Sequence, residues 1–185
     1  MKILLYTGYR TGSKTLGLWL EEELNIKYYH EPLNISVNSY PGIDIYKLES
    51  GIIKISPIDN FVYDDNINFF DKIIVLYRID TLAQAESMVW ALDKKVWQFG
   101  DNFSSNYYNI SEYLNFNKQK IINWKNHMDS ENEYLKTLKN CIHITYENLF
   151  YSKIDIKKIE NYLHFKSKSF PNPISKLRDN KKRII

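Results

Sequence analysis

A short apolar run, Ile3 to Thr7, passes directly into a turn bounded by Gly8 and Gly12 and then into a segment with helical periodicity. Glycine tolerates the backbone conformations that a tight turn needs, and the first N–H groups of the following helix have no partner within that helix. Because the helix dipole makes this end positive, a strand, a glycine turn and a helix in this order can bind an anion. The segment predicts a phosphate cradle at the carboxyl end of the first strand.

The turn supplies the cations and hydroxyl donors that suit a phosphate, namely Arg10, Thr11, Ser13, Lys14 and Thr15. Its spacing differs from the nucleoside-triphosphatase loop, in which four residues separate the glycines and a lysine follows the second glycine directly. Here three residues separate Gly8 from Gly12, and a serine stands before the lysine. The turn therefore points to a phosphate-binding protein of another kind.

A second apolar run, Lys72 to Tyr77, leads into a second predicted helix. Arg78 follows this run directly, and Asp80 is placed to cap the helix. Asp80, Gln84, Ser87 and Ala91 share one helical face, on which Ser87 can look toward the strand ends. The opposite face predicts a core stripe, which consists of Leu82, Ala85, Val89, Leu92 and Val96.

Both segments resemble those of sulfotransferases that use 3′-phosphoadenosine 5′-phosphosulfate (PAPS). The run from Arg10 to Ser13 resembles their 5′-phosphosulfate loop, and the run from Arg78 to Ala91 resembles their 3′-phosphate segment. The sequence from Arg78 to Ala91 most resembles that of the bacterial trehalose sulfotransferase group. These enzymes usually carry the phosphate-binding arginine one residue later, where this chain has Ile79. The resemblance thus leaves two roles for Arg78, which are binding the 3′-phosphate and pairing with a carboxylate.

The resemblance also implies roles for individual residues. Arg10 would neutralise the leaving phosphate, and the cofactor site would include Thr11, Gly12, Ser13, Lys14, Thr15 and Ser87. Glu31, in His30-Glu31-Pro32, stands where the trehalose group has its general base, and His30 is the second candidate. A structural role for both, with Glu31 capping the turn before Pro32, remains open.

Two further segments extend the resemblance toward the end of the chain. Tyr146 opens a Tyr-Glu-Asn-Leu run similar to the family's Tyr-Glu-Asp-Leu, and its ring would pack against adenine or within the core. Glu147 in that run is more typical of a scaffold residue than of a catalyst. Arg178, in a basic run, resembles the loop that closes over the cofactor phosphates, while a solvated tail is the alternative.

Composition limits the other possibilities. With 185 residues, residues 1–185 are expected to form one domain with its own core. The net charge of +3 suits a small anionic ligand and falls short of a dedicated nucleic-acid binder. Cys141 is the single cysteine, so neither an intramolecular disulfide nor a cysteine zinc site is expected, and no metal is required. The apolar runs are too short for a membrane span or a signal peptide, so we expect a cytoplasmic protein that does not bind membranes.

Short β-rich runs alternate with helical stretches, which predicts an α/β fold of three layers, P-loop-like, with a mostly parallel central sheet flanked by helices. We expect helices over Lys14 to Leu24, after Asp80, over Ile110 to Met128, and after a capping pair of Ser152 and Asp155. The expected strands are Lys2 to Thr7, Lys27 to His30, Ile52 to Ile55, Lys72 to Tyr77 and Cys141 to Tyr146.

The sequence therefore predicts a sulfotransferase that moves a sulfuryl group from PAPS to a hydroxyl of a carbohydrate or small metabolite. The acceptor class is implied by the resemblance alone. Two alternatives remain at this point. One is a nucleotide or small-molecule kinase with a degenerate phosphate loop, and the other is a nucleotide-binding protein without catalytic activity.

Overall fold

The computed structural model describes residues 1–34, 43–57, 59, 61, 63–94 and 110–170. Its strands form one sheet in the order β2-β3-β1-β4-β5, and every neighbouring pair is parallel. The strands are β1 (Lys2–Thr7), β2 (Tyr28–His30), β3 (Gly51–Ile55), β4 (Lys72–Tyr77) and β5 (Ile142–Thr145). The predicted α/β fold with a parallel central sheet is confirmed, and each predicted strand lies within two residues of its observed bounds.

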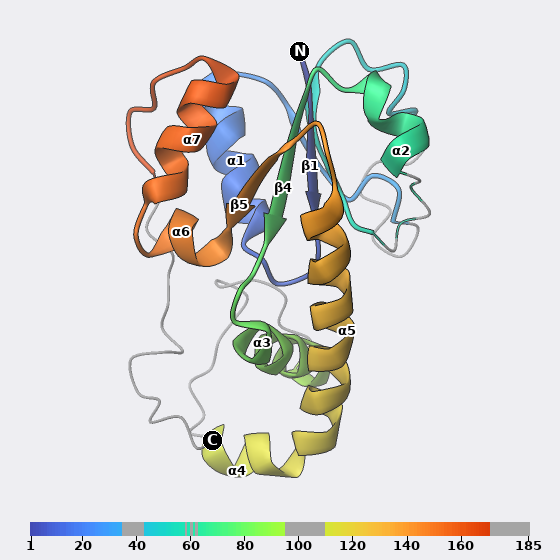
Figure 1. Cartoon of the computed structure of the whole chain (residues 1–185), viewed down its shortest axis with the longest axis vertical. Coiled ribbons are helices and arrows are strands. Elements are labelled where there is room, and N and C mark those ends of the chain that lie inside the picture. Colours follow the sequence, from blue (N-terminus) through green and yellow to red (C-terminus); the bar gives the residue numbers. More distant parts are fainter. Residues whose placement is uncertain (35–42, 58, 60, 62, 95–109, 171–185) are drawn as a thin grey trace.

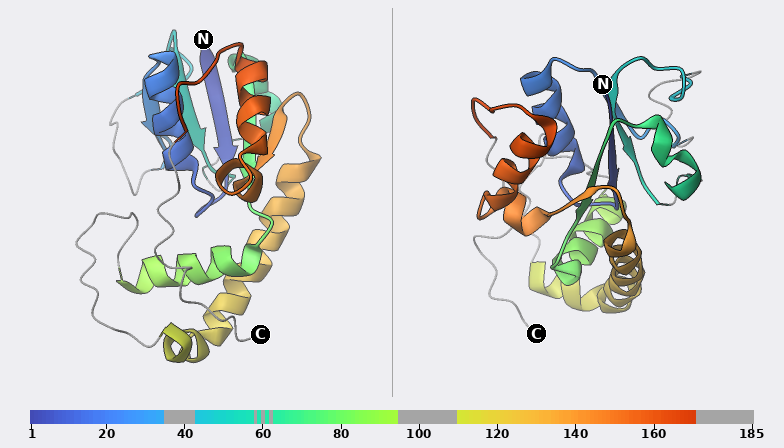
Figure 2. Two further views of the ribbon diagram at one scale, coloured as in Figure 1. Left: turned by 90° about the vertical axis from the view of Figure 1, so that its left-hand side faces the viewer. Right: turned by 45° about the horizontal axis from the view of Figure 1, so that its top comes forward.

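Helices cover both faces of this sheet and its carboxyl end. The helical elements are α1 (Ser13–Leu24), α2 (Tyr63–Asn66), a 3-10 turn (Ile67–Phe69), α3 (Thr81–Lys94), α4 (Ile110–Phe116), α5 (Lys118–Thr137), α6 (Tyr146–Phe150) and α7 (Ile154–Leu163). Figure 1 shows α1 and α7 on one side of the sheet and α2 and α5 on the other. In Figure 2 α3 crosses beyond the ends of the strands. The start of α1 and the start of α3 thus meet at the same edge of the sheet.

The central strand β1 separates two apolar cores. Ile3 and Leu5 pack with α1 and α7 on one face, while Leu4 and Tyr6 pack with residues of α2 and α5 on the other. All four side chains are at most 1% exposed. A strand that is buried on both faces is apolar at most of its positions, which explains why Ile3 to Tyr6 form a continuous apolar run and do not alternate with polar residues.

The predicted helix from Ile110 to Met128 is wrong in its bounds, because two helices, α4 and α5, occupy this stretch and the second continues to Thr137. They meet at Asn117, whose backbone N–H and side-chain Nδ2 both donate to the carbonyl of Tyr113, at 3.0 and 3.1 Å. An asparagine side chain that bonds a carbonyl four residues back competes with the helical hydrogen bonds. The chain therefore changes direction here.

The predicted core stripe on α3 is only half correct. Ala85 and Val89 are buried, whereas Leu82 and Leu92 are 38% and 42% exposed, and Val96 lies outside the described residues. The reason is that α3 packs against α5 and not against the flat face of the sheet. Contact with α5, together with Tyr113 of α4, buries a narrower strip of α3 than contact with a sheet would.

The predicted capping pair of α7 is also wrong. Lys153, with φ 59°, occupies the position before the helix, and no side chain caps it. Asp155 instead accepts a hydrogen bond from the backbone N–H of Thr145 at 2.8 Å, and the Ser152 hydroxyl donates to the carbonyl of Asn148. Asp155 thus ties α7 to the end of β5. Within the part of the chain that the structure describes, no helix is long and apolar enough to cross a membrane.

Candidate functional site

The turn between β1 and α1 is braced from within. The hydroxyls of Thr7 and Thr11 lie 2.6 Å apart, and the Thr11 hydroxyl donates to the carbonyl of Gly8 at 3.0 Å. Thr7 and Thr11 are fully buried. The hydroxyl of Thr11 therefore stabilises the shape of the turn. Its expected hydrogen bond to a phosphate stays a prediction.

Gly12 opens α1 without a side-chain cap. Its φ of 80° is in the left-handed region, and a Cβ there would lie 2.5 Å from Cε2 of Phe150. The first turn of α1, with Ser13, Lys14 and Thr15, carries no acidic residue and no side-chain cap bond. Glycine thus lets the chain pass beneath Phe150 and leaves the positive end of the helix available to an anion.

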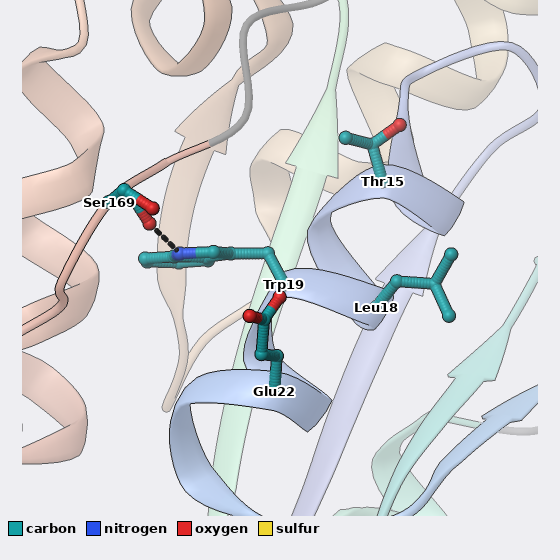
Figure 3. A pocket seen from close by; sticks show the side chains of 5 residues that line it. All are labelled: Thr15, Leu18, Trp19, Glu22 and Ser169. Carbon is teal, nitrogen blue, oxygen red and sulfur yellow. Dashed lines mark hydrogen bonds between the residues drawn. The ribbon is translucent and has the colours of Figure 1, made fainter.

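Thr15 lines a hollow on the flank of α1 that has a volume of about 340 Å³. Figure 3 shows its lining, which consists of Thr15, Leu18, Trp19, Glu22 and Ser169. Trp19 Nε1 donates to the carbonyl of Ser169 at 2.6 Å and so joins α1 to the segment after α7. Among the predicted site residues that the structure describes, only Thr15 faces this hollow.

Two hydrogen bonds join α3 to the turn. Arg10 Nε donates to Oγ of Ser87 at 2.9 Å, and Gln84 Nε2 donates to the carbonyl of Tyr9 at 2.6 Å. The prediction that Ser87 looks toward the strand ends is confirmed, and Gln84 on the same face contacts the same turn. The two segments that are predicted to bind phosphate groups, which lie far apart in the sequence, therefore meet at one place.

Arg78 lies behind Arg10 and is 6% exposed. Its Nη1 lies 3.4 Å from the carbonyl of Arg10, its Cζ lies 4.5 Å from the centre of the Tyr146 ring, and its Nε lies 3.8 Å from Oε1 of Glu147. Arg78 thus pairs with a carboxylate, which is one of its two expected roles, and its contact with a phosphate stays a prediction. Ile79, at the position where the related enzymes carry arginine, is 64% exposed.

Glu147 is a scaffold residue, as its sequence context predicts. Its carboxylate accepts the backbone N–H groups of Ile79 and Asp80 at 3.0 and 3.1 Å. Asp80 in turn accepts the N–H of Ala83 at 3.0 Å, so its predicted capping of α3 is confirmed. These bonds fix the start of α3, and with it Ser87, relative to α6, which carries Tyr146.

The site concentrates positive charge. Burial, followed by the charge of the neighbouring Arg78, lowers the pKa of Arg10. Two guanidinium groups thus lie close together beside the positive end of α1. A bound phosphate or sulfate group would lower the electrostatic energy of both.

The two base candidates lie at the end of β2. Lys54, which is 1% exposed near the end of β3, forms a hydrogen-bonded ion pair with Glu31 and donates to Oγ of Ser56 at 2.7 Å. Asn34 Nδ2 also donates to Glu31, at 3.2 Å. Burial acts to raise the pKa of Glu31, but the charge and hydrogen bond of Lys54 outweigh it and lower the pKa overall. Glu31 is therefore ionised at neutral pH.

His30 lies beside this pair. Its Nδ1 is 2.8 Å from the hydroxyl of Tyr28, and its Nε2 is 4.0 Å from Oε1 of Glu31. Burial lowers the pKa of His30; Glu31 opposes this, and the charges of Lys54 and Lys14 add to it. The imidazole is thus neutral at pH 7 and able to accept a proton. Because Lys14 belongs to the first turn of α1, its influence connects this group with the phosphate cradle.

Lys54 and Glu131 are the residues that the sequence analysis missed. Lys54 interrupts an otherwise apolar run, Ile52 to Ile55, and a cation in a buried strand is a signal that would have found it. Glu131 lies on α5 against Gly8, where its carboxylate would collide with any Cβ. No sequence pattern marks it, because α5 is polar along most of its length. Arg178 lies outside the described residues.

Comparison with known proteins supports the fold alone. No profile of a known protein family matches the chain, and no curated protein matches it. Among solved structures, the chain is similar to mouse sulfotransferase SULT7A1 complexed with PAP, with 16% identity and a TM-score of 0.50. The similarity covers 91% of this chain and 59% of the mouse protein, so the chain spans about three fifths of that structure. This likeness does not show that the chain is similar to the trehalose sulfotransferase group in particular. It shows that the chain has the P-loop-like α/β fold of a sulfotransferase.

Proposed function

We propose that this protein transfers a sulfuryl group from PAPS to a hydroxyl group of a carbohydrate or small metabolite. The observation that carries the proposal is the bond between Arg10 Nε and Ser87 Oγ at the uncapped start of α1. It brings a cation, a hydroxyl and the first turn of a helix that has no side-chain cap to one point at the carboxyl edge of the sheet. In open α/β sheets this edge is the usual place for a ligand.

The residues present suit the donor substrate. The backbone from Gly12 to Thr15 would hold the 5′-phosphate, with Arg10 beside it. Ser87 and Arg78 would contact the 3′-phosphate, and Tyr146 would pack against the adenine. PAPS supplies an activated sulfuryl group, and the task of the protein is to orient it and to neutralise the leaving phosphate.

In the proposed reaction the acceptor oxygen forms a bond to sulfur while the bond between sulfur and the phosphate oxygen breaks. The hydroxyl proton goes to Glu31 or His30, and the charge that develops on the phosphate is stabilised by Arg10. The lowered pKa of Glu31 makes its carboxylate a weak base. Neutral His30, 4.0 Å away, provides a second acceptor for the same proton.

Two other functions use parts of the same site. A kinase would need ATP with magnesium, and the position of Lys14 after Ser13 argues against the usual nucleoside-triphosphatase loop. A binding protein without turnover would keep the cradle only. The exposed Ile79 favours this second candidate, because a side chain without charge replaces the arginine of the related enzymes.

Calorimetric titration with 3′-phosphoadenosine 5′-phosphate (PAP), and in parallel with ATP and magnesium, tests the proposal. We expect PAP to bind with a micromolar Kd, or about 8 kcal/mol, and ATP at least ten times more weakly. Turnover of PAPS by a protein that binds PAP distinguishes the enzyme from a binding protein. Preference for ATP, or binding of neither nucleotide, would contradict the proposed function.

Replacing Glu31 with glutamine tests the base. If Glu31 accepts the proton, we expect kcat to fall by about 10²–10⁴ while PAP affinity is kept. If His30 is the base, His30→Gln produces this loss instead. Exposed Glu49, changed to glutamine, is the matched control for loss of a carboxylate. Unchanged rates in both His30→Gln and Glu31→Gln would exclude this pair from proton transfer.

A further inference from the structure

A polar cluster lies next to the phosphate cradle and is not used by the binding of PAPS. We name it the Lys54 cluster, and its members are Tyr9, Glu31, Lys54, Asp59 and Glu131. Its four charged residues are between 1% and 9% exposed. They come from different elements that reach the carboxyl edge of the sheet, so the fold brings them together although the sequence separates them.

The cluster contains more carboxyl groups than ammonium groups. The ammonium of Lys54 is held by Glu31 and by Ser56 Oγ, and it lies 5.3 Å from the centre of the Tyr9 ring. Among the described residues, Asp59 accepts a hydrogen bond only from the backbone N–H of Ser56, at 2.7 Å. The ammonium of Lys54 therefore faces three carboxyl groups and forms an ion pair with only one of them, Glu31.

Glu131 is the member whose bonding is incomplete. It is 8% exposed, and among the described residues its Oε1 has no hydrogen-bond partner. A buried carboxylate oxygen without a partner is costly, so natural proteins rarely keep one without a use. Burial raises the pKa of Glu131 to about 7, with Lys54 acting in the opposite direction and Asp59 in the same direction.

Glu131 lies near the residues that are proposed to take part in sulfuryl transfer. Its carboxylate lies against Gly8, the residue at which β1 enters the cradle. Tyr9 and Arg10 follow directly, and the charges of Glu31, Asp59 and Glu131 all act on the Tyr9 hydroxyl and raise its pKa to about 12, after burial as the largest cause. A group bound at Glu131 would therefore lie close both to the leaving phosphate and to the base candidates.

We propose that Glu131, with Asp59, binds an ammonium group of the acceptor, so that the acceptor is a hydroxyl compound that also carries a protonated amine. Amino sugars and amino alcohols belong to this class. An ammonium supplies several hydrogen-bond donors and one positive charge, which are what the unpaired oxygen and the excess of carboxyl groups require. This proposal rests on the proposed function, because it names the acceptor of the same reaction.

Matched probes test the proposal on the protein saturated with PAP. D-glucosamine is compared with D-glucose, and tyramine with 4-ethylphenol, by calorimetric titration at pH 7. We expect the amine of at least one pair to bind at least ten times more tightly than its neutral partner. In Glu131→Gln this preference should fall at least tenfold. Glu133→Gln, an exposed change on the same helix, should keep it.

The outcomes separate the two proposals. Failure to bind PAP contradicts the proposed function itself. Binding of PAP without any preference for the amines, or a preference that survives in Glu131→Gln, overturns only the ammonium site. Folding of the variant is checked by its unfolding temperature at pH 8. At this pH Glu131→Gln should melt at or above the temperature of the unchanged protein, since the substitution removes an ionised carboxylate that has a buried oxygen without a partner among the described residues.

The same melting experiment gives a reading that needs no ligand. The pKa of Glu131 rises from 4.5 to about 7 on folding, so the folded state holds a proton that the unfolded state has lost. This group's contribution to stability therefore falls as pH rises from about 4.5 to about 7 and is then constant. Glu131→Gln should remove this fall. An equal pH dependence in Glu131→Gln and the unchanged protein would contradict the unpaired carboxylate, and with it the ammonium site.

Discussion

Replacing Arg10 with glycine is expected to abolish transfer and to lower the affinity for PAP by about 100-fold or more, which corresponds to ~3 kcal/mol. The change removes a partly buried guanidinium whose Nε lies 2.9 Å from Oγ of Ser87, beside the start of α1. Arg10 has a φ of 59°, a left-handed conformation that glycine adopts without strain. The turn itself should therefore survive. Calorimetry with PAP and the rate of sulfuryl transfer measure the two losses.

The choice of glycine separates function from folding. The unfolding temperature of Arg10→Gly should stay within a few degrees of the original, because relief of backbone strain offsets the lost hydrogen bond. Arg10→Lys keeps the charge but loses the Nε donor to Ser87, and we expect an intermediate affinity. Lys120→Ala, which removes a 61% exposed cation from α5, is the control for net charge. Normal PAP binding by Arg10→Gly would remove Arg10 from the phosphate site.

Replacing Lys54 with methionine should produce the largest loss of stability, about 3–5 kcal/mol. Methionine fills much the same space, but it leaves the Glu31 carboxylate buried without its cation. For a chain of this size each kcal/mol lowers the unfolding temperature by about 2–4 °C. Urea denaturation at pH 7 measures the difference in the free energy of unfolding.

The double variant Lys54→Met with Glu31→Gln gives the matched comparison. It removes both charges together, so much of the lost stability should return. Lys47→Met, which breaks an ion pair whose lysine is 85% exposed, should change the free energy of unfolding by less than about 1 kcal/mol. If Lys54→Met and Lys47→Met were equally mild, Lys54 would not be the group that neutralises Glu31.

Local patterns were sufficient to predict the elements on which the cradle is built. Ile3 to Thr7 is apolar at each residue up to the threonine, and Gly8 and Gly12 bound the turn, so a strand, a turn and a helix follow from short-range rules. The same reasoning predicted that Ser87 looks toward the strand ends, because helical periodicity fixes which residues share a face. Its bond to Arg10 agrees with this.

The features that could not be predicted depend on contacts between distant segments. Asp155 has the sequence context of a helix cap, yet the backbone of Thr145 lies within its reach only after β5 and α7 have packed. The break at Asn117 leaves the apolar period intact and so gives no periodic signal. Glu131 acquires its significance from Gly8, on a different element of the fold. Only the three-dimensional structure shows these neighbours.

The order of the strands also has a consequence for how the chain is made. The central strand β1 pairs with β3, which begins at Gly51, and with β4, which begins at Lys72. Translation at about 5–20 residues per second leaves β1 without a partner for several seconds after it leaves the ribosome. During this time an apolar segment is open to wrong pairing, and helix α1 has no sheet to cover. Pairing of β1 therefore has to wait until β3, and then β4, has left the ribosome.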